Sequence, residues 1–598
     1  MIAVPPMETA RGRAWPVAGK QSQSIWLLAA VMLLAIVPYL NALSDGFTLD
    51  DEPQILTNPV VHGGVDPIGI LASPLFPGDL YRPLTTFTFA VNQTLSPDNP
   101  SYFHAANLVL HAAVTLLLFW LSLRLFRRTS AAVIAAALFA LHPLHTEAVT
   151  SLVGRAEELA ALFGLLSLLA ALRIDETGDA WTRRGWHALS VVAFIGAITS
   201  KESGLTVLPL ILLARPALRG ESLWRGSWNE LRRLDWVPYA LCVALFLHLR
   251  GYVTGGLLAG DTVTPLESML AFVPTGLRVR TALAVVWDYV SLMHFPLVLS
   301  ADYSTSQVAV VETWWSPSCI AGLVLLVAGT AVVLFAKRRT VAFATALPIV
   351  TFSLTSNLLF PVGTAKAERL VYMPSIGWAL LAGLAFDWCL RQPRYRRVGA
   401  VALAAMLATF SIRTWVRNRD WADNATLHQS SAASSPRSAK AHYNYAVALQ
   451  NDGNQQAALF HYRRAIEIYP WSEGAVLGIG IAYEKSGDMD RATAWYRRAL
   501  ALSPSFMRAH SDLCRALFVR QRYVEAEHAC RDGLRYEPAN ANLLKGLGGS
   551  LFAAGEREMG MTVLRRALRL NPADGELERA LAEMESAPAN HAEAGGVG

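Results

Sequence analysis

The sequence has few cysteines and few charged residues. Five cysteines in 598 residues are too few for a disulfide framework or a cysteine-rich zinc module. Charged residues make up only 16% of the chain, against roughly 25% in soluble domains, while hydrophobic residues make up 53%. The net charge of +6 comes from short basic clusters between apolar runs, a pattern of membrane topology that predicts no nucleic-acid partner.

Apolar runs of nearly membrane-spanning length follow one another from residue 25 to about residue 414. The first run lacks a clear small-residue cleavage site and is predicted to be a retained helix. Placing all basic clusters on the cytoplasmic side gives about eleven crossings, a cytoplasmic N-terminus and a C-terminal third outside. The run at 203–216 is the shortest of these. The expected crossings are 25–43, 105–124, 131–147, 158–173, 186–200, 203–216, 235–250, 317–336, 340–359, 374–390 and 398–414.

Residues 265–299 are ambiguous. An interfacial segment or a re-entrant hairpin on the outer face keeps the charge rule intact. A single crossing there would move the basic residues 337–339 to the outside.

Five prolines recur every 34 residues in the last third of the chain, which is the period of the tetratricopeptide (TPR) helix-turn-helix repeat. Repeats are expected to start at residues 439, 473, 507 and 541, with a capping helix at 575–587. The prolines are Pro436, Pro470, Pro504, Pro538 and Pro572.

The predicted fold is therefore all-α, with a polytopic membrane domain followed by an α-solenoid. The expected parts are a cytoplasmic tail (1–24), a membrane domain (25–418) with a long outer loop (44–104), a linker (419–438), four repeats with a cap (439–587) and a disordered tail (588–598).

Cys514 and Cys530 fall on the two helices of the third repeat, at positions that face each other. If the repeats lie outside, their compartment is oxidising. A disulfide closing this short loop would then contribute roughly 3 kcal/mol to the stability of the fold. Two small buried thiols explain the same residues equally well.

Three consecutive carboxylates, Asp50, Asp51 and Glu52, follow the first apolar run. They form either a solvated acidic turn or a general base, because carboxylates crowded at a membrane edge have raised pKa values. Other polar side chains gather at the same outer ends. These are Arg82, His104, Asn107, His111, His142, His145, Glu147, Arg155, Glu157, Lys201, Glu202, Lys366, Glu368, Arg369 and Tyr372.

The histidines could ligate a metal, but none shows the spacing of an HExxH helix, so hydrogen bonding between helices is the preferred interpretation and no metal or cofactor is expected. Cations beside carboxylates at a membrane surface suit one reaction class. Arg and Lys would hold a lipid-linked phosphate, a carboxylate would deprotonate an acceptor hydroxyl, and a polyprenyl phosphate would leave.

An ordered set of motifs resembles one family. The motifs are Asp50-Asp51, the Tyr-Arg-Pro-Leu-Thr run at 81–85, His104…Asn107…His111, the run at 141–149, Gly154-Arg155-Ala156-Glu157, Ser200-Lys201-Glu202 and Glu368-Arg369…Tyr372. With the repeats behind them, they are similar to the transmembrane-and-TPR-containing protein O-mannosyltransferases and their bacterial relatives, over about residues 25–580.

The resemblance implies a GT-C glycosyltransferase that moves a sugar, typically mannose, from a polyprenyl phosphate to Ser or Thr of exported proteins. Inversion without a metal is implied, with Asp50 as the preferred base, although Glu52 blurs the register and leaves Asp51 open. The phosphate would be held by Arg82, Arg155, Lys201 and Arg369. Supporting residues would be His104, His142, His145, Glu147, Glu202, Glu368 and Tyr372.

The implied location is the bacterial inner membrane with the repeats outside, where they bind either the protein acceptor or a docking partner. Two rival functions exist. A membrane-anchored scaffold for envelope complexes would need no polar outer rim, and a transporter for lipid-linked glycans would place polar residues at mid-membrane.

Overall fold

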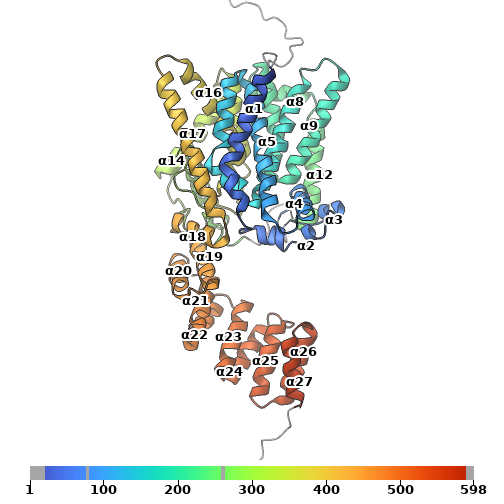
Figure 1. The fold of residues 1–598 in the computed structure, drawn as a ribbon, viewed down its shortest axis with the longest axis vertical. Helices are drawn as coiled ribbons and strands as arrows, with labels where there is room; N and C mark the ends of the chain where they lie inside the picture. The colour runs from blue at the N-terminus through green and yellow to red at the C-terminus, as the bar shows by residue number, and fades with distance from the viewer. Residues whose placement is uncertain (1–20, 76–79, 257–262, 587–598) are drawn as a thin grey trace, which may run out of the picture. The chain divides into compact units, whose positions relative to one another are not determined.

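The computed structural model describes residues 21–75, 80–256 and 263–586, which form helices joined by turns and loops, without a β-strand among them. The predicted all-α class is therefore confirmed. The chain divides into two compact units, residues 1–436, called the body, and 437–598, called the arm (Figure 1). Most of the predicted N-terminal tail and the predicted disordered tail at 588–598 lie outside the described residues.

The body begins with α1 and ends with α18. Short helices follow α1 in the loop region and also separate several of the long helices. The long and medium helices are α1 (Gln21–Ile36), α4 (Pro83–Leu95), α5 (Pro100–Phe126), α6 (Thr129–Ala140), α8 (Arg155–Ile174), α9 (Ala180–Ser200), α10 (Val207–Arg219), α11 (Leu223–Arg232), α12 (Val237–Thr254), α13 (Thr275–His294), α14 (Pro317–Phe335), α15 (Arg339–Phe352), α16 (Tyr372–Arg391), α17 (Arg396–Asn418) and α18 (Asn424–Ser434).

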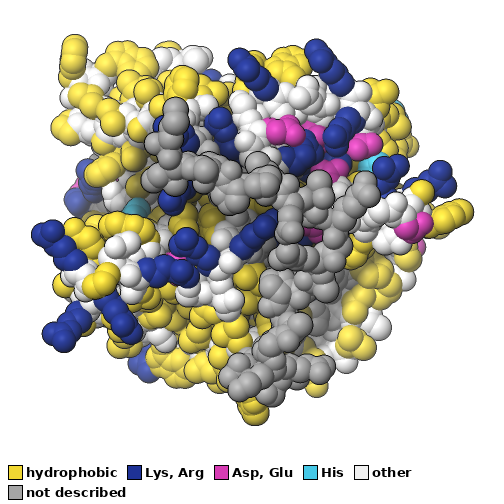
Figure 2. Space-filling model, turned by 90° about the horizontal axis from the view of Figure 1, so that it is seen from above, with side chains coloured by type: hydrophobic (Ala, Val, Ile, Leu, Met, Phe, Trp, Pro, Cys, Tyr) yellow, Lys and Arg dark blue, Asp and Glu magenta, His cyan; other side chains and the backbone are white. Residues whose placement is uncertain are grey.

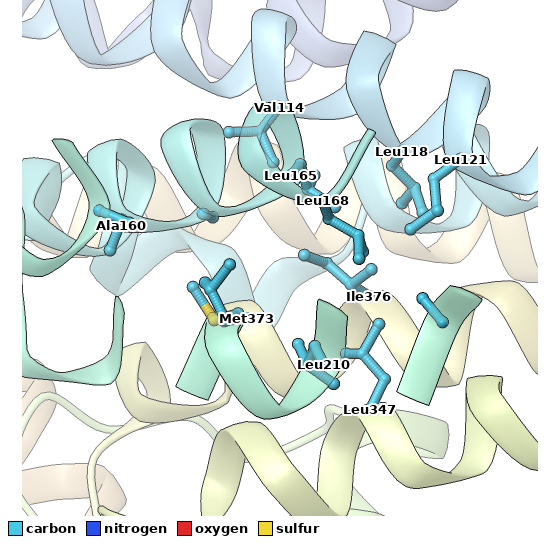
Figure 3. Close-up of a cluster of buried hydrophobic side chains, with 14 of the residues drawn as sticks. Val114, Leu118, Leu121, Ala160, Leu165, Leu168, Leu210, Leu347, Met373 and Ile376 are labelled. Carbon is cyan, nitrogen blue, oxygen red and sulfur yellow. The ribbon is translucent and has the colours of Figure 1, made fainter. Parts of the chain in front are cut away.

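Helices far apart in the sequence share one apolar core (Figure 3). Leu118 of α5, Leu168 of α8, Leu210 of α10, Leu347 of α15 and Ile376 of α16 are all buried in it. Since lipid tails are as apolar as these side chains, close packing rather than water exclusion holds such helices together.

Length and composition mark six helices of the described residues as able to cross a membrane, or seven if the bent pair Thr129–Ala140 and Pro143–Val149 is one span. The expected eleven crossings are not confirmed by this criterion. The other expected spans fall on α8 and α9, which carry charged residues at their ends, and on α10 and α15, which have only 13 and 14 residues.

The ambiguous stretch at 265–299 contains a short turn of 3-10 helix (Met269–Ala271) and α13. Along its length α13 contacts loops: the Val311 N–H donates to Thr281 Oγ1 at 2.8 Å, and the Tyr289 hydroxyl lies 2.8 Å from both the N–H and the carbonyl oxygen of Ala367. α13 also packs against α14. It is a single uninterrupted helix, which argues against a re-entrant hairpin, and it is not one of the described helices whose length and composition mark them as able to cross a membrane.

The long loop at 44–104 is folded. Its short helices η2 (Glu52–Leu56), α2 (Pro59–His62) and α3 (Pro67–Leu71), together with α4, pack around Ile55, Val61 and Phe89. Asn58, Asp66 and Asn99 each cap the helix that starts at the following proline, the preferred arrangement at a helix N-terminus. The described residues of this loop, 44–75 and 80–104, therefore form a folded platform rather than an irregular connection.

The two ends of the body differ. Helices α2, α3 and α4 lie at its lower end in Figure 1, while the α8–α9 and α16–α17 turns lie at its upper end. Seen from that upper end, Lys and Arg side chains ring the surface, with fewer acidic ones (Figure 2). The polar candidate residues thus gather at the end opposite the basic turns.

The arm consists of four helical hairpins and a final helix. The first helix of each hairpin begins at Ala439, Glu473, Met507 or Ala541, the residues at which the repeats are expected to start. The helices are α19 (Ala439–Asn451), α20 (Gln455–Ile468), α21 (Glu473–Lys485), α22 (Met489–Leu502), α23 (Met507–Val519), α24 (Tyr523–Leu534), α25 (Ala541–Ala553), α26 (Arg557–Leu570) and α27 (Gly575–Ser586).

The turn inside each hairpin contains a residue with positive φ, in the left-handed region of backbone conformation. Gly453, Gly487 and Gly555 supply it in three repeats, with φ of 83°, 85° and 99°. The third repeat has Gln521 there, at φ 57°, a conformation that costs a side-chain-bearing residue about 1–2 kcal/mol. This weaker turn lies in the hairpin that carries the two cysteines.

Cys514 of α23 and Cys530 of α24 form a disulfide, with a Cα separation of 5.4 Å. We expect thiol labelling of unfolded, non-reduced protein to find three reactive thiols, Cys242, Cys319 and Cys389. Reduction before labelling should raise the count to five. Five thiols without reduction would show that the arm holds two free cysteines instead.

Candidate functional site

Asp50 and Asp51 are neighbours with different surroundings. Asp51 is fully buried, and its two carboxylate oxygens accept the N–H groups of Thr48 at 2.8 Å and Val153 at 3.1 Å. Burial raises the pKa of Asp51 to about 7. Asp50 is only half-buried, at the start of η2. We call residues 44–52 the acidic loop. Asp51 ties this loop to Val153, whereas Asp50 is the more accessible of the two carboxylates.

Cations from distant segments pair with the carboxylates of this site. The Arg369 guanidinium interacts electrostatically with Asp50 and Glu157 and donates to Glu147 at 2.8 Å, while the Arg369 backbone N–H donates to the same carboxylate at 3.0 Å. Lys201, between α9 and α10, forms a buried ion pair with Glu157. The structure thus brings together the predicted residues Asp50, Glu147, Lys201 and Arg369.

Two arginines share one carboxylate beside Lys201. Glu202 accepts from Arg82 at 2.9 Å and from Arg250 at 2.5 Å. Burial alone would raise the pKa of Glu202, but the two guanidinium groups outweigh it and lower this pKa to about 2. Two guanidinium groups and the Lys201 ammonium group thus gather around Glu202, and such cations are the groups that bind phosphate and other anionic ligands.

Arg155 lies in different surroundings. It is 1% exposed, and its guanidinium donates to Asn107 at 2.8 Å, to Asn92 at 2.6 Å and to the carbonyl oxygens of Thr88 and Phe103. It also lies over the Phe89 and Phe103 rings. A phosphate would have to displace these acceptors, so the phosphate role predicted for Arg155 does not fit this geometry.

The buried histidines link helices. His111 of α5 lies 2.9 Å from the Tyr372 hydroxyl, and His145 lies 2.8 Å from the Ser375 hydroxyl. His142 meets the Met293 carbonyl oxygen at 3.0 Å, while His104 is buried beneath the backbone of Asp45 and Gly46. Within the described ranges, no group of three or more His, Cys, Asp or Glu side chains is placed to hold a metal ion.

Glu368 connects three segments. Its carboxylate accepts from the Ser300 N–H at 2.6 Å and the Tyr303 hydroxyl at 2.7 Å, and lies 4.0 Å from the Arg417 guanidinium. Sequence reasoning missed Arg250, Tyr303 and Arg417. Arg250 had a usable signal, because it is the one Arg, Lys, Asp or Glu of the apolar helix α12, and such residues are functional candidates by default.

Curated relatives match most of this chain. Protein O-mannosyl-transferase TMTC3 of Homo sapiens is 28% identical over 500 residues, which cover 78% of this chain and 54% of TMTC3. Protein O-mannosyl-transferase F38B6.6 of Caenorhabditis elegans is 29% identical over 468 residues, covering 75% of this chain and 64% of that protein. Protein O-mannosyl-transferase TMTC1 of Homo sapiens is 30% identical over 496 residues, covering 74% and 55%.

The chain is homologous to the TMTC proteins. The resemblance seen in the sequence motifs is therefore confirmed. This chain spans a little over half the length of the two human TMTC proteins.

The arm has its own match. A family model described as "Tetratricopeptide repeat" matches residues 439–470 and 475–506. Among solved structures, the TPR protein YrrB is 15% identical and covers 33% of this chain and 98% of its own, at a TM-score of 0.24.

Proposed function

We propose that this chain is a membrane glycosyltransferase that moves a sugar, mannose by homology, from a polyprenyl phosphate to Ser or Thr hydroxyls of exported proteins. The observation that carries the proposal is that half-buried Asp50 interacts electrostatically with Arg369, and that Lys201 links Arg369 to the group in which Arg82 and Arg250 share Glu202. The names of the TMTC relatives support mannose and a protein acceptor.

In the proposed reaction Asp50 takes the proton of the acceptor hydroxyl while its oxygen attacks the anomeric carbon. The bond from that carbon to the phosphate oxygen breaks, and the polyprenyl phosphate leaves with the electron pair. Attack from the face opposite the phosphate inverts the configuration. Arg82, Arg250, Lys201 and Arg369 would stabilise the negative charge that grows on the phosphate.

Lys201 and Arg369 are already paired with glutamates, so they are preoriented for this role. Burial lowers the pKa of Lys201, and the Glu157 carboxylate opposes that shift. The paired glutamates hold both cations in place before the donor arrives, which avoids reorganisation during the reaction.

The proposed location is the plasma membrane, with the basic turns inside and Asp50 outside. Exposed aromatic residues support two interfaces. Trp181, Trp224 and Trp228 lie next to the basic turns. Trp314 and Trp315 precede α14, at the end of that helix opposite its basic turn.

The direct test incubates purified protein with polyprenyl-phosphate mannose and Ser/Thr-containing peptides, and measures peptide mass and site by fragmentation. A hexose on Ser or Thr that depends on the lipid-linked donor supports the proposal. Transfer from a nucleotide sugar without lipid would identify another donor class. Absence of transfer, with stable recruitment of envelope proteins by the repeats, would favour the scaffold.

The topology gives a separate prediction. A reporter that is active only in the cytoplasm should be silent when it follows Gly598 and active when it is inserted after Arg338, in the basic turn between α14 and α15. Activity at both positions would place the arm in the cytoplasm and change the number of crossings by one.

A further inference from the structure

The segment that leads from α17 to the arm is bonded to the acidic loop. We call residues 419–435 the connector; it contains a short turn of 3-10 helix (Arg419–Trp421) and α18. The Gly46 N–H donates to the Ala422 carbonyl oxygen at 2.8 Å, and the Leu49 N–H donates to Asn424 Oδ1 at 2.8 Å. The acidic loop and the connector, some 375 residues apart, are thus held together at two points.

The second of these bonds falls on an unusual residue. Leu49 has φ of 49°, in the left-handed region that a bulky side chain rarely adopts. Leu49 directly precedes Asp50, so a return of Leu49 to an ordinary conformation would redirect the Asp50 carboxylate. Observed strain of this kind at a candidate site points to a functional constraint.

We propose that Asn424 is a positioning residue for Asp50. Its side-chain oxygen holds the Leu49 N–H, which keeps the left-handed turn and aims the Asp50 carboxylate at the acceptor hydroxyl. This inference rests on the proposed function, in which Asp50 is the base. It also makes the connector, which continues in sequence into the repeats, part of the support of the base.

The rest of the connector supports this role. At its far end the Ser435 hydroxyl lies 2.8 Å from the Ser300 hydroxyl and 2.6 Å from the Asp302 carbonyl oxygen. Asp45 of the acidic loop interacts with Asp423, and burial together with that neighbouring charge raises the pKa of Asp45 to about 7. The connector is therefore held to the acidic loop at residues 422–424 and to residues 300–302 at its far end.

Asn424 is exposed, so its removal is distinguishable from loss of the fold. Without it, the Leu49 N–H can bind water, while Asp51 still ties the loop to Thr48 and Val153. Asn424→Ala should then change the orientation of Asp50 more than the stability of the body. Asn424→Asp keeps an acceptor oxygen, and Gln429→Ala removes an exposed side chain from the same helix as a matched control.

The experiment measures transfer kinetics, thermal unfolding and hydrogen exchange on the full chain. For Asn424→Ala we expect about a fivefold lower kcat, the effect of one hydrogen bond, with KM for both substrates within about twofold and an unchanged Tm. Deuterium uptake in peptides covering residues 44–51 should rise. Asn424→Asp should restore both readouts, and Gln429→Ala should match the parent protein.

Parental kcat and parental exchange in Asn424→Ala would overturn the inference, as would an Asn424→Asp variant as impaired as Asn424→Ala. If the parent protein transfers no sugar, the proposed function fails. The hydrogen-exchange measurement still tests whether Asn424 holds the Leu49 N–H. Faster exchange at 44–51 in Asn424→Ala, reversed in Asn424→Asp, would then show that the Asn424 side chain holds the Leu49 N–H. Unchanged exchange would reject this.

Discussion

Asp50→Asn is expected to lower sugar transfer by about 10²- to 10⁴-fold, the usual effect of losing a general base. The amide keeps the size of the side chain but cannot take a proton. Since Asp50 is half-buried, the folded protein should be retained. Initial rates with the lipid-linked donor, together with thermal unfolding of the same preparation, measure both effects.

Its two neighbours provide the controls. Glu52 is exposed, so Glu52→Gln should leave the rate within about twofold. Asp51 accepts two backbone N–H groups, and an amide there presents its NH₂ to one of them. Asp51→Asn should therefore lose activity and thermal stability together. A parental rate in Asp50→Asn, with an inactive but stably folded Asp51→Asn, would reassign the base to Asp51.

The sequence predicted the features that depend on neighbouring residues or on a regular spacing along the chain. The 34-residue spacing of prolines predicts the repeat architecture because the hairpins repeat the same turn chemistry, with a glycine at the left-handed position in three of the four. Motifs predicted that Asp50, Lys201 and Arg369 belong to one site, and the structure links Arg369 electrostatically to both Asp50 and Lys201.

Pairing between distant residues could not be predicted in this way. An arginine in an apolar helix is a candidate ligand or a structural residue, and only its acceptors decide which. Arg250 was missed although it shares Glu202 with Arg82, and Arg155 was assigned to the phosphate although Asn92 and Asn107 already bind it. The number of crossings stays a prediction, because α10 and α15 are apolar but shorter than a helix that spans a membrane.

Arg155 gives the second large effect. Arg155→Ala is expected to destabilise the body by about 3–5 kcal/mol, the usual result of removing one member of a buried charged network. The carbonyl oxygens of Thr88 and Phe103 would lose a donor, and the buried Glu158 would lose its nearby cation. Unfolding in detergent, followed by fluorescence-detected size exclusion over a temperature series, measures this loss.

Arg82→Ala is the matched comparison for Arg155→Ala. Arg82 is partly exposed, and Arg250 remains to neutralise Glu202, so the fold should persist while KM for the lipid donor rises. The two arginines therefore predict opposite patterns, a lower Tm for Arg155→Ala and a higher donor KM for Arg82→Ala. A parental Tm in Arg155→Ala, with a raised KM for the donor alone, would return Arg155 to the phosphate site. That result would require the donor phosphate to displace Asn92 and Asn107 from the guanidinium.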